Sequence, residues 1–196
     1  ADLNLIYIGI AVPIPWGTIQ RDTKGGDVLY TNSTLALDAE TGEIAWYFQH
    51  IPGGNWDQDH PFERLIVETE VAPNPDAVSC MNPNINSSER RKVITGVPGK
   101  PGIVWTLDAA TGDFLWATQT NYQNVITGVD VEKRQGITNP ALDITEIAQR
   151  KLVCPTTQGG INWNSVDYSP QSNFLYAPTN NTCMTFFLRP VDPVVG

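Results

Sequence analysis

Two carboxylates stand two residues apart in the segment from Trp56 to Asp59, which reads Trp-Asp-Gln-Asp. Clustered carboxylate oxygens are the hard ligands that Ca²⁺ or a trivalent lanthanide ion prefers. A carboxylate beside a bound cation stays ionised and is suited to act as a base. Taken alone, Asp57 can equally be a loop aspartate that caps a turn, and Asp59 a solvated loop charge. The pair therefore indicates a candidate metal and base site.

The histidines and cysteines add no metal site to this pair. His50 and His60 have no Cys or His at the spacing of a metal site, so we expect both to be ordinary loop residues. Cys80, Cys154 and Cys183 are an odd number of cysteines, which leaves one thiol over if two pair. Cys154 and Cys183 are 29 positions apart and bracket two strand-like runs, and this spacing is as compatible with a disulfide as with unrelated thiols. A disulfide would imply an oxidising compartment.

Charge and composition exclude several classes of function. The 196 residues include 21 acidic and 12 basic side chains, which gives a net charge of −9. A nucleic-acid or anionic-membrane surface calls for clustered Lys and Arg, so neither partner is expected. The most apolar stretch, from Leu5 to Trp16, is too short to cross a bilayer and is broken by Pro13 and Pro15. No transmembrane helix is therefore predicted.

A repeat positions these residues in a fold. The segment 35–46 returns as the segment 105–116, offset by 70 residues, with the common core Leu-Asp-Ala-x-Thr-Gly-x-x-x-Trp. This pattern predicts a β-hairpin, because the Asp can accept hydrogen bonds from turn amides and the Gly suits a positive φ. Two other segments, 1–9 and 167–177, read as partner strands of such hairpins.

Repeated strand hairpins predict an all-β chain and favour a β-propeller, whose blades each hold about four strands. At about 40 to 50 residues a blade, the chain holds about three blades, which cannot close a ring. We therefore expect residues 1–196 to be part of a single propeller domain of a longer chain. Segments 53–59, 72–89 and 121–143 read as irregular, and 141–152 alone could hold a helix. A small β-sandwich with chance repeats is the alternative.

The repeated core resembles the tryptophan-docking motif of the pyrroloquinoline quinone (PQQ) dependent dehydrogenases, which are eight-bladed propellers of the bacterial periplasm. The likeness extends in order through three further segments, 2–9, 13–16 (Pro-Ile-Pro-Trp) and 26–38. It implies oxidation of a primary alcohol or polyol to the carbonyl, with PQQ and a Ca²⁺ or lanthanide ion as cofactors. It also implies a location in the periplasm or on the periplasmic face of the inner membrane, with cytochrome c or a membrane quinone as the electron acceptor.

The resemblance assigns roles to single residues. Asp57 stands where the family carries its catalytic aspartate, so it would be the base and a metal ligand. Lys100 begins a segment like the strand whose leading Lys or Arg lies beside the quinone, and it would stabilise the charge that develops on the quinone oxygen. Asn162 and Trp163 resemble the loop that borders the cofactor. On residue type alone, an exposed turn lysine, an Asn bonded to loop backbone and a core Trp remain alternatives.

Other positions connect the chain to different branches of the family. Asp59, as a second metal ligand, is found at this offset in the lanthanide-dependent methanol branch. The run Trp-Asp-x-Asp-x-Pro from Trp56 also resembles membrane-bound sugar and polyol dehydrogenases. Cys154 and Cys183 match a disulfide of the methanol branch, and Trp46 and Trp116 are expected between blades. Val12 departs from the pattern, because the alcohol-oxidising branch has an Asn metal ligand there and a valine side chain cannot coordinate a cation.

Three functions remain open at this stage. The first is a quinoprotein alcohol dehydrogenase with the site described above. The second is a non-catalytic propeller with PQQ-like repeats that acts as a scaffold for protein binding or outer-membrane assembly. Such a scaffold has no reason to keep Asp57, Lys100 and Asn162 together, whereas Val12 favours it. The third is a sugar (aldose) dehydrogenase, which differs from the first in its substrate profile.

Overall fold

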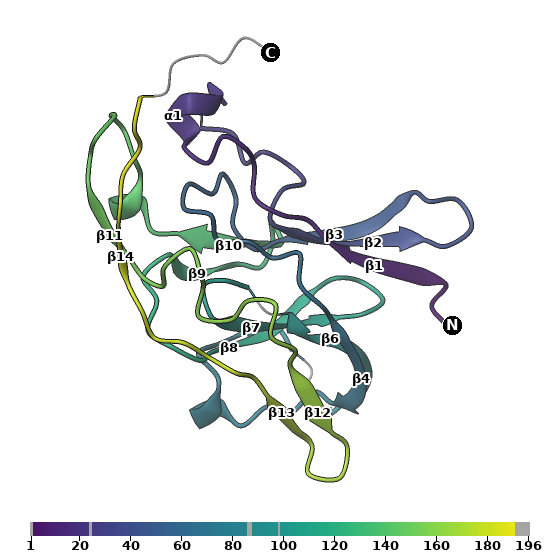
Figure 1. Ribbon diagram of the computed structural model, residues 1–196. Helices are drawn as coiled ribbons and strands as arrows, with labels where there is room; N and C mark the ends of the chain where they lie inside the picture. Colours follow the sequence, from purple (N-terminus) through teal and green to yellow (C-terminus); the bar gives the residue numbers. More distant parts are fainter. Residues whose placement is uncertain (1, 24, 86–87, 98, 191–196) are drawn as a thin grey trace.

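The computed structural model describes residues 2–23, 25–85, 88–97 and 99–190. Strands dominate the described residues, and they form two five-stranded sheets and two two-stranded ladders (Figure 1). The elements in chain order are β1 (Leu5–Gly9), α1 (Thr18–Arg21), β2 (Ser33–Asp38), β3 (Ile44–Gln49), β4 (Leu65–Glu70), the 3₁₀ helix η1 (Pro75–Ala77), β5 (Cys80–Met81), β6 (Arg90–Val97), β7 (Ile103–Asp108), β8 (Phe114–Gln119), β9 (Ile126–Asp130), β10 (Gln135–Thr138), the 3₁₀ helix η2 (Pro140–Leu142), β11 (Lys151–Val153), β12 (Asp167–Ser169), β13 (Phe174–Tyr176) and β14 (Met184–Phe186).

Each five-stranded sheet is built around one copy of the repeat. The first sheet has the order β1-β2-β3-β10-β9 and the second has the order β4-β6-β7-β8-β5. In the first turn, Oδ1 of Asp38 accepts hydrogen bonds from the amides of Glu40 and Thr41, at 2.9 and 2.8 Å. Asp108 does the same for the amides of residues 110 and 111 in the second turn. The expected hairpins are therefore confirmed, down to the capping aspartate.

The first sheet docks on the second through Trp46. Its indole Nε1 donates to the backbone oxygen of Ala109, 3.2 Å away, in the turn of the second repeat. Gly112, with φ of 74°, lies directly under the indole ring, where a Cβ would overlap it. Tyr7 Oη donates to the same Ala109 oxygen at 2.9 Å. The expectation that Trp46 sits between blades is confirmed, whereas Trp116 is only half-buried in the described residues.

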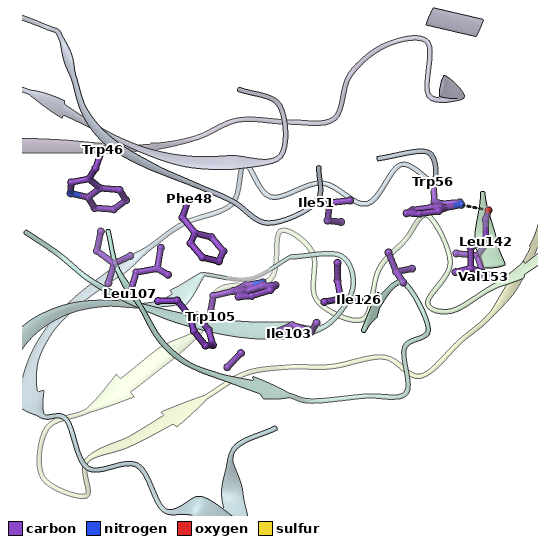
Figure 2. Packing of buried hydrophobic residues seen from close by; sticks show 14 of the residues in the cluster. Trp46, Phe48, Ile51, Trp56, Ile103, Trp105, Leu107, Ile126, Leu142 and Val153 are labelled. Atoms are coloured by element: carbon purple, nitrogen blue, oxygen red, sulfur yellow. Dashed lines mark hydrogen bonds between the residues drawn. The ribbon is translucent and has the colours of Figure 1, made fainter. Parts of the chain in front are cut away.

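The core lies between the two sheets (Figure 2). Phe48 from β3 packs on Trp105 from β7, with ring centroids 5.5 Å apart, and Trp105 meets Phe114 edge-on. Each large apolar side chain buried here stabilises the fold by about 2–3 kcal/mol relative to an exposed one. The core therefore holds the loops at its edge in a fixed relation to both sheets.

Four expectations about local structure are wrong. Segment 72–89 is not irregular throughout, because it holds η1 and the short strand β5, which pairs with β8. The segment 141–152 holds no α-helix, because η2 ends at Leu142 and the chain then passes through turns into β11. Segment 121–143 is not irregular throughout, since β9 and β10 form a hairpin there that adds to the outer edge of the first sheet. Segment 167–177 is a complete hairpin, β12–β13, rather than a single partner strand.

Within the described residues, no helix has the length and apolar character needed to cross a membrane.

Candidate active site

Two loops at the edge of the core carry the candidate residues. Asp57 and Asp59 lie in the loop between β3 and β4, and Lys100 lies in the turn between β6 and β7. The Lys100 amide donates to the backbone oxygen of Asp59 at 3.0 Å, so the two loops are joined directly. Trp56, which is buried at the start of the carboxylate loop, donates its Nε1 to the Leu142 oxygen at 3.1 Å (Figure 2).

Lys100 lies between the two carboxylates. Its Nζ is 2.6 Å from Asp59 Oδ2 and 3.2 Å from Asp57 Oδ2. Lys100 is only 7% exposed, so the alternative of an exposed turn lysine is wrong. The remaining oxygen of Asp59, Oδ1, accepts the Val12 amide at 3.0 Å. Val12 therefore contacts the site through its backbone rather than its side chain.

The environment separates the two carboxylates. Burial raises the pKa of Asp57, and the positive charge of Lys100 only partly offsets this. Burial acts in the same direction on Asp59, but hydrogen bonds from the Lys100 ammonium and the Val12 amide outweigh it and lower the pKa of Asp59. Asp59 is therefore the carboxyl that stays ionised, and Asp57 is the one that takes up a proton more readily.

The donor set is limited to these two carboxylates. Among residues 2–23, 25–85, 88–97 and 99–190, no group of three or more His, Cys, Asp or Glu side chains could hold a metal ion. Two carboxylates are nevertheless the right ligand type for a hard cation. Two carboxylates and one ammonium leave a net charge of −1, which suits a cation that finds further ligands elsewhere.

The loop with Asn162 and Trp163 lies beside Lys100. The Gly160 amide donates to the Lys100 oxygen at 2.7 Å. Asn162 Nδ2 donates to the Gln158 oxygen at 2.7 Å, while its Oδ1 is buried with no hydrogen-bond partner among the described residues. Trp163 is 76% exposed and packs edge-on against Phe62, so it is not a core residue. The loop that binds the Lys100 oxygen through Gly160 thus also carries an acceptor without a partner among the described residues and an exposed indole.

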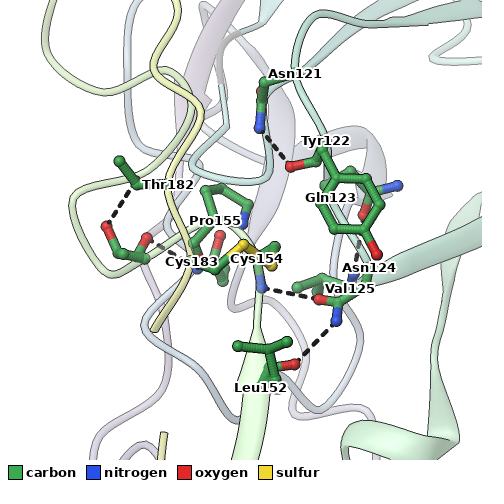
Figure 3. The surroundings of a disulfide bond; sticks show 12 residues. Asn121, Tyr122, Gln123, Asn124, Val125, Leu152, Cys154, Pro155, Thr182 and Cys183 are labelled. Atoms are coloured by element: carbon green, nitrogen blue, oxygen red, sulfur yellow. Dashed lines mark hydrogen bonds between the residues drawn. A yellow bond between two sulfur atoms is a disulfide. The ribbon is translucent and has the colours of Figure 1, made fainter. Parts of the chain in front are cut away.

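A disulfide joins Cys154 to Cys183, as the family resemblance implied (Figure 3). Cys80 is a free, half-buried cysteine. The disulfide links the end of β11 to the chain just before β14, whose strands pair antiparallel. It therefore anchors the start of the loop that leads to Gly160 and Asn162.

The two histidines were misjudged from the sequence. His50 and His60 are fully buried and their rings stack, with centroids 4.5 Å apart and planes within 6°. His50 Nε2 lies 2.8 Å from Thr34 Oγ1, while neither ring nitrogen of His60 has a partner among the described residues. The His60 ring packs against Gly99, where a Cβ would overlap it. The glycine before Lys100 is the signal that could have shown this close approach.

Buried histidines make the protein sensitive to acid. Burial, with a contribution from Arg64, lowers the pKa of His60 to about 3, against about 6.5 in an unfolded chain. Below pH 6.5 the unfolded state binds a proton that the folded state does not, so the free energy of unfolding falls by up to about 1.4 kcal/mol per pH unit for this group. We expect His60→Gln to lose less stability between pH 7 and pH 5 than the unsubstituted protein, by about 2 kcal/mol. Urea unfolding at the two pH values measures this, and equal losses would contradict it.

A family model described as "Glucose/ethanol/alcohol dehydrogenase, beta-propeller domain" matches residues 1–82. The quinohemoprotein alcohol dehydrogenase of Comamonas testosteroni is 30% identical over 181 residues, which cover 92% of this chain and 23% of that protein. The 1-butanol dehydrogenase (cytochrome c) of Thauera butanivorans is 32% identical over 171 residues, covering 87% of this chain and 22% of that one. The chain thus spans about a quarter of the length of the curated relatives it matches.

Solved structures show the same likeness in three dimensions. A structure of the Comamonas testosteroni quinohemoprotein alcohol dehydrogenase superposes with a TM-score of 0.77 at 28% identity, over 93% of this chain and 24% of that one. A europium-containing methanol dehydrogenase gives a TM-score of 0.77 at 26% identity, over 94% and 29% of the two chains. The expected fold, an all-β segment of a quinoprotein propeller, is confirmed by these matches.

Proposed function

From the premise that this chain matches the β-propeller of the PQQ-dependent quinoprotein alcohol dehydrogenase family in sequence and fold, we propose that the protein carrying it oxidises a primary alcohol or polyol to the carbonyl. The observation that supports this most is the buried contact of Lys100 with Asp57 and Asp59. A buried charge is stable in a protein only when an opposite charge is paired with it, and a single carboxylate is enough to pair with Lys100. The second carboxylate is therefore one more than this pairing needs.

Asp57 is proposed as the base. PQQ, when bound, supplies the two-electron acceptor that takes hydride from the alcohol carbon. An Oδ atom of Asp57 accepts the hydroxyl proton of the alcohol, and the raised pKa of this carboxyl brings it closer to the working pH than a free aspartate. Asp59 remains ionised and keeps Lys100 oriented, so that the ammonium is held at a fixed place beside the base.

The residues present fit both implied cofactors. Asp57 and Asp59 offer hard oxygens that would hold Ca²⁺ or a lanthanide ion, which would act as a Lewis acid on the substrate oxygen. Val12 contributes no side-chain ligand, so the remaining ligands of the ion must come from other residues. Asn162 Oδ1, which is buried without a partner among the described residues, and the exposed face of Trp163 are groups that a polar, planar cofactor such as PQQ would satisfy.

The proposal also covers the electron acceptor, the cellular location and the domain to which the chain belongs. Electrons would pass to cytochrome c or a membrane quinone, and the location would be the periplasm or the periplasmic face of the inner membrane. The Cys154–Cys183 disulfide supports an oxidising compartment. Residues 1–196 would form part of a single propeller domain, and the relatives are about four times as long as this chain.

Reconstitution tests the proposal. The protein carrying this chain is incubated with PQQ and either Ca²⁺ or La³⁺, and dye reduction is followed with primary alcohols, polyols and aldoses. We expect PQQ-dependent turnover that is higher with alcohols or polyols than with aldoses. Preference for aldoses would move the assignment to a sugar dehydrogenase. No PQQ binding and no turnover with either metal would contradict the enzyme and favour a scaffold.

A further inference from the structure

Gln58 stands between the two carboxylates and has no role in the function proposed above. Its side chain is buried, with 1% of the residue exposed. Its Nε2 donates to two successive backbone oxygens, those of Pro155 at 3.1 Å and Thr156 at 3.3 Å. Its Oε1 is buried with no partner among the residues that the structure describes. Gln58 therefore joins the carboxylate loop to a segment almost 100 residues further along the chain.

The segment that Gln58 binds is firmly anchored (Figure 3). Cys154, next to Pro155, is held by the disulfide to Cys183. Its amide also donates to Asn124 Oδ1 at 2.9 Å, and its oxygen accepts the Asn124 amide at 3.1 Å. Further along the same segment, the Gly160 amide donates to the Lys100 oxygen at 2.7 Å. One anchored loop thus contacts both sides of the charged cluster, Gln58 on one side and Lys100 on the other.

The backbone at Asp57 makes this anchoring important. Asp57 has φ of 55°, in the left-handed region that residues with a Cβ adopt only when the surroundings hold them there. The direction of its carboxylate depends on that conformation. Gln58 is the next residue, and its two hydrogen bonds fix the backbone immediately after Asp57. An apolar side chain of the same size would fill the space without leaving a buried amide oxygen unpartnered, so the amide is explained by its two donor contacts.

We propose that Gln58 is a positioning residue, whose amide fastens the carboxylate loop to the disulfide-anchored loop and so sets the place of Asp57 relative to Lys100. This inference rests on the proposed function, because it concerns the same site. It makes the Cys154–Cys183 disulfide act on catalysis through Gln58. Misplacement of a reacting group by about 1 Å can lower a rate by up to about 100-fold, so the expected effect is large enough to measure.

The test uses Gln58→Met in the protein carrying this chain, reconstituted with PQQ and metal. Methionine keeps the size of glutamine and removes the donor. Gln49→Met is a matched control, since Gln49 is also buried and donates Nε2 to two backbone oxygens at 2.8 and 3.0 Å, and its Oε1 has no partner in the described part of the chain. We expect Gln58→Met to lower kcat by about 10-fold or more with little change in KM. We expect Gln49→Met to lower Tm by about as much as Gln58→Met does, and to leave kcat unchanged.

The coupling to the disulfide separates positioning from general stability. We expect Cys154→Ser with Cys183→Ser to lower kcat, and to lower it no further once Gln58→Met is present. Terbium(III) binding, followed by its luminescence, is expected to weaken about 10-fold in Gln58→Met, and this readout does not need turnover. If Gln58→Met does not fold, Gln58→Asn, which keeps a shorter amide, takes its place with the same expected losses.

Three results would overturn the inference. They are equal kcat in the Gln58 and Gln49 variants, independent multiplication of the Gln58 and disulfide effects, or unchanged terbium affinity. If the unsubstituted protein turns over and the variants give any of these results, the proposed function stands and only this inference fails. An unsubstituted protein that binds PQQ under no condition contradicts the proposed function, and this inference with it.

Discussion

Asp57→Asn is expected to lower kcat for PQQ-dependent alcohol oxidation by about 10² to 10⁴-fold, the range that a positioned general base contributes. Asparagine has nearly the same shape as aspartate, but its amide cannot take the hydroxyl proton. Asp59 and Lys100 keep their 2.6 Å contact in this variant, so the loop loses only one of its charged pairs. Steady-state kinetics with PQQ and metal at saturation, together with PQQ binding by absorbance, measure the effect.

A second aspartate provides the control for this variant. Asp143 is also half-buried, and burial likewise raises its pKa, but it follows η2 and makes no contact with Lys100 that the structure shows. We expect Asp143→Asn to keep kcat within about twofold of the unsubstituted protein. If Asp57→Asn retained more than a tenth of the turnover while PQQ and metal stayed bound, Asp57 would not be the base.

Turn chemistry explains which parts of the fold could be predicted. The hairpins around Asp38 and Asp108 follow from local interactions, because one carboxylate binds two amides and one glycine adopts a positive φ. Local interactions fix such turns regardless of what surrounds them. The failed helix in 141–152 is the opposite case, since Lys151–Val153 is drawn into a strand by pairing with Met184–Phe186. A partner more than 30 residues away in sequence leaves no local signal.

The candidate site also has features that the sequence could predict and features that it could not. Asp57, Asp59 and Lys100 could be selected by their residue types and by their place in a family pattern, and the structure brings all three together. The sequence could not show that Lys100 is buried or that it contacts both carboxylates, because this depends on two loops meeting at the edge of the core. His60 was misread for a related reason: its burial comes from stacking on His50 and packing on Gly99, neither of which has a spacing rule.

Lys100→Met is expected to lower the free energy of unfolding by about 3 kcal/mol, the low end of the range for breaking a buried pair, because it leaves two partly buried carboxylates without their cation. Methionine retains most of the volume of the lysine stem, so the loss reflects charge rather than a cavity. The matched control is Lys133→Met, whose partner Asp130 lies 3.6 Å away with the lysine side chain 70% exposed. Exposed pairs of this kind contribute less than about 1 kcal/mol.

The pH dependence of the stability that Lys100→Met loses distinguishes a loss of charge pairing from a loss of packing. Without Lys100, burial is the largest influence on both carboxyls and raises their folded-state pKa values, although the Val12 amide still acts in the opposite direction on Asp59. The unfolded state then releases protons that the folded state retains, so the deficit is largest at neutral pH and shrinks as the carboxyls become protonated on acidification. Adding Asp59→Asn to Lys100→Met removes one unpaired charge and is expected to restore roughly half of the lost stability at pH 7. Urea unfolding of the metal-free protein at pH 7 and pH 5 measures both effects, and an equal deficit at the two pH values would show that Lys100 stabilises the loops through packing instead of charge.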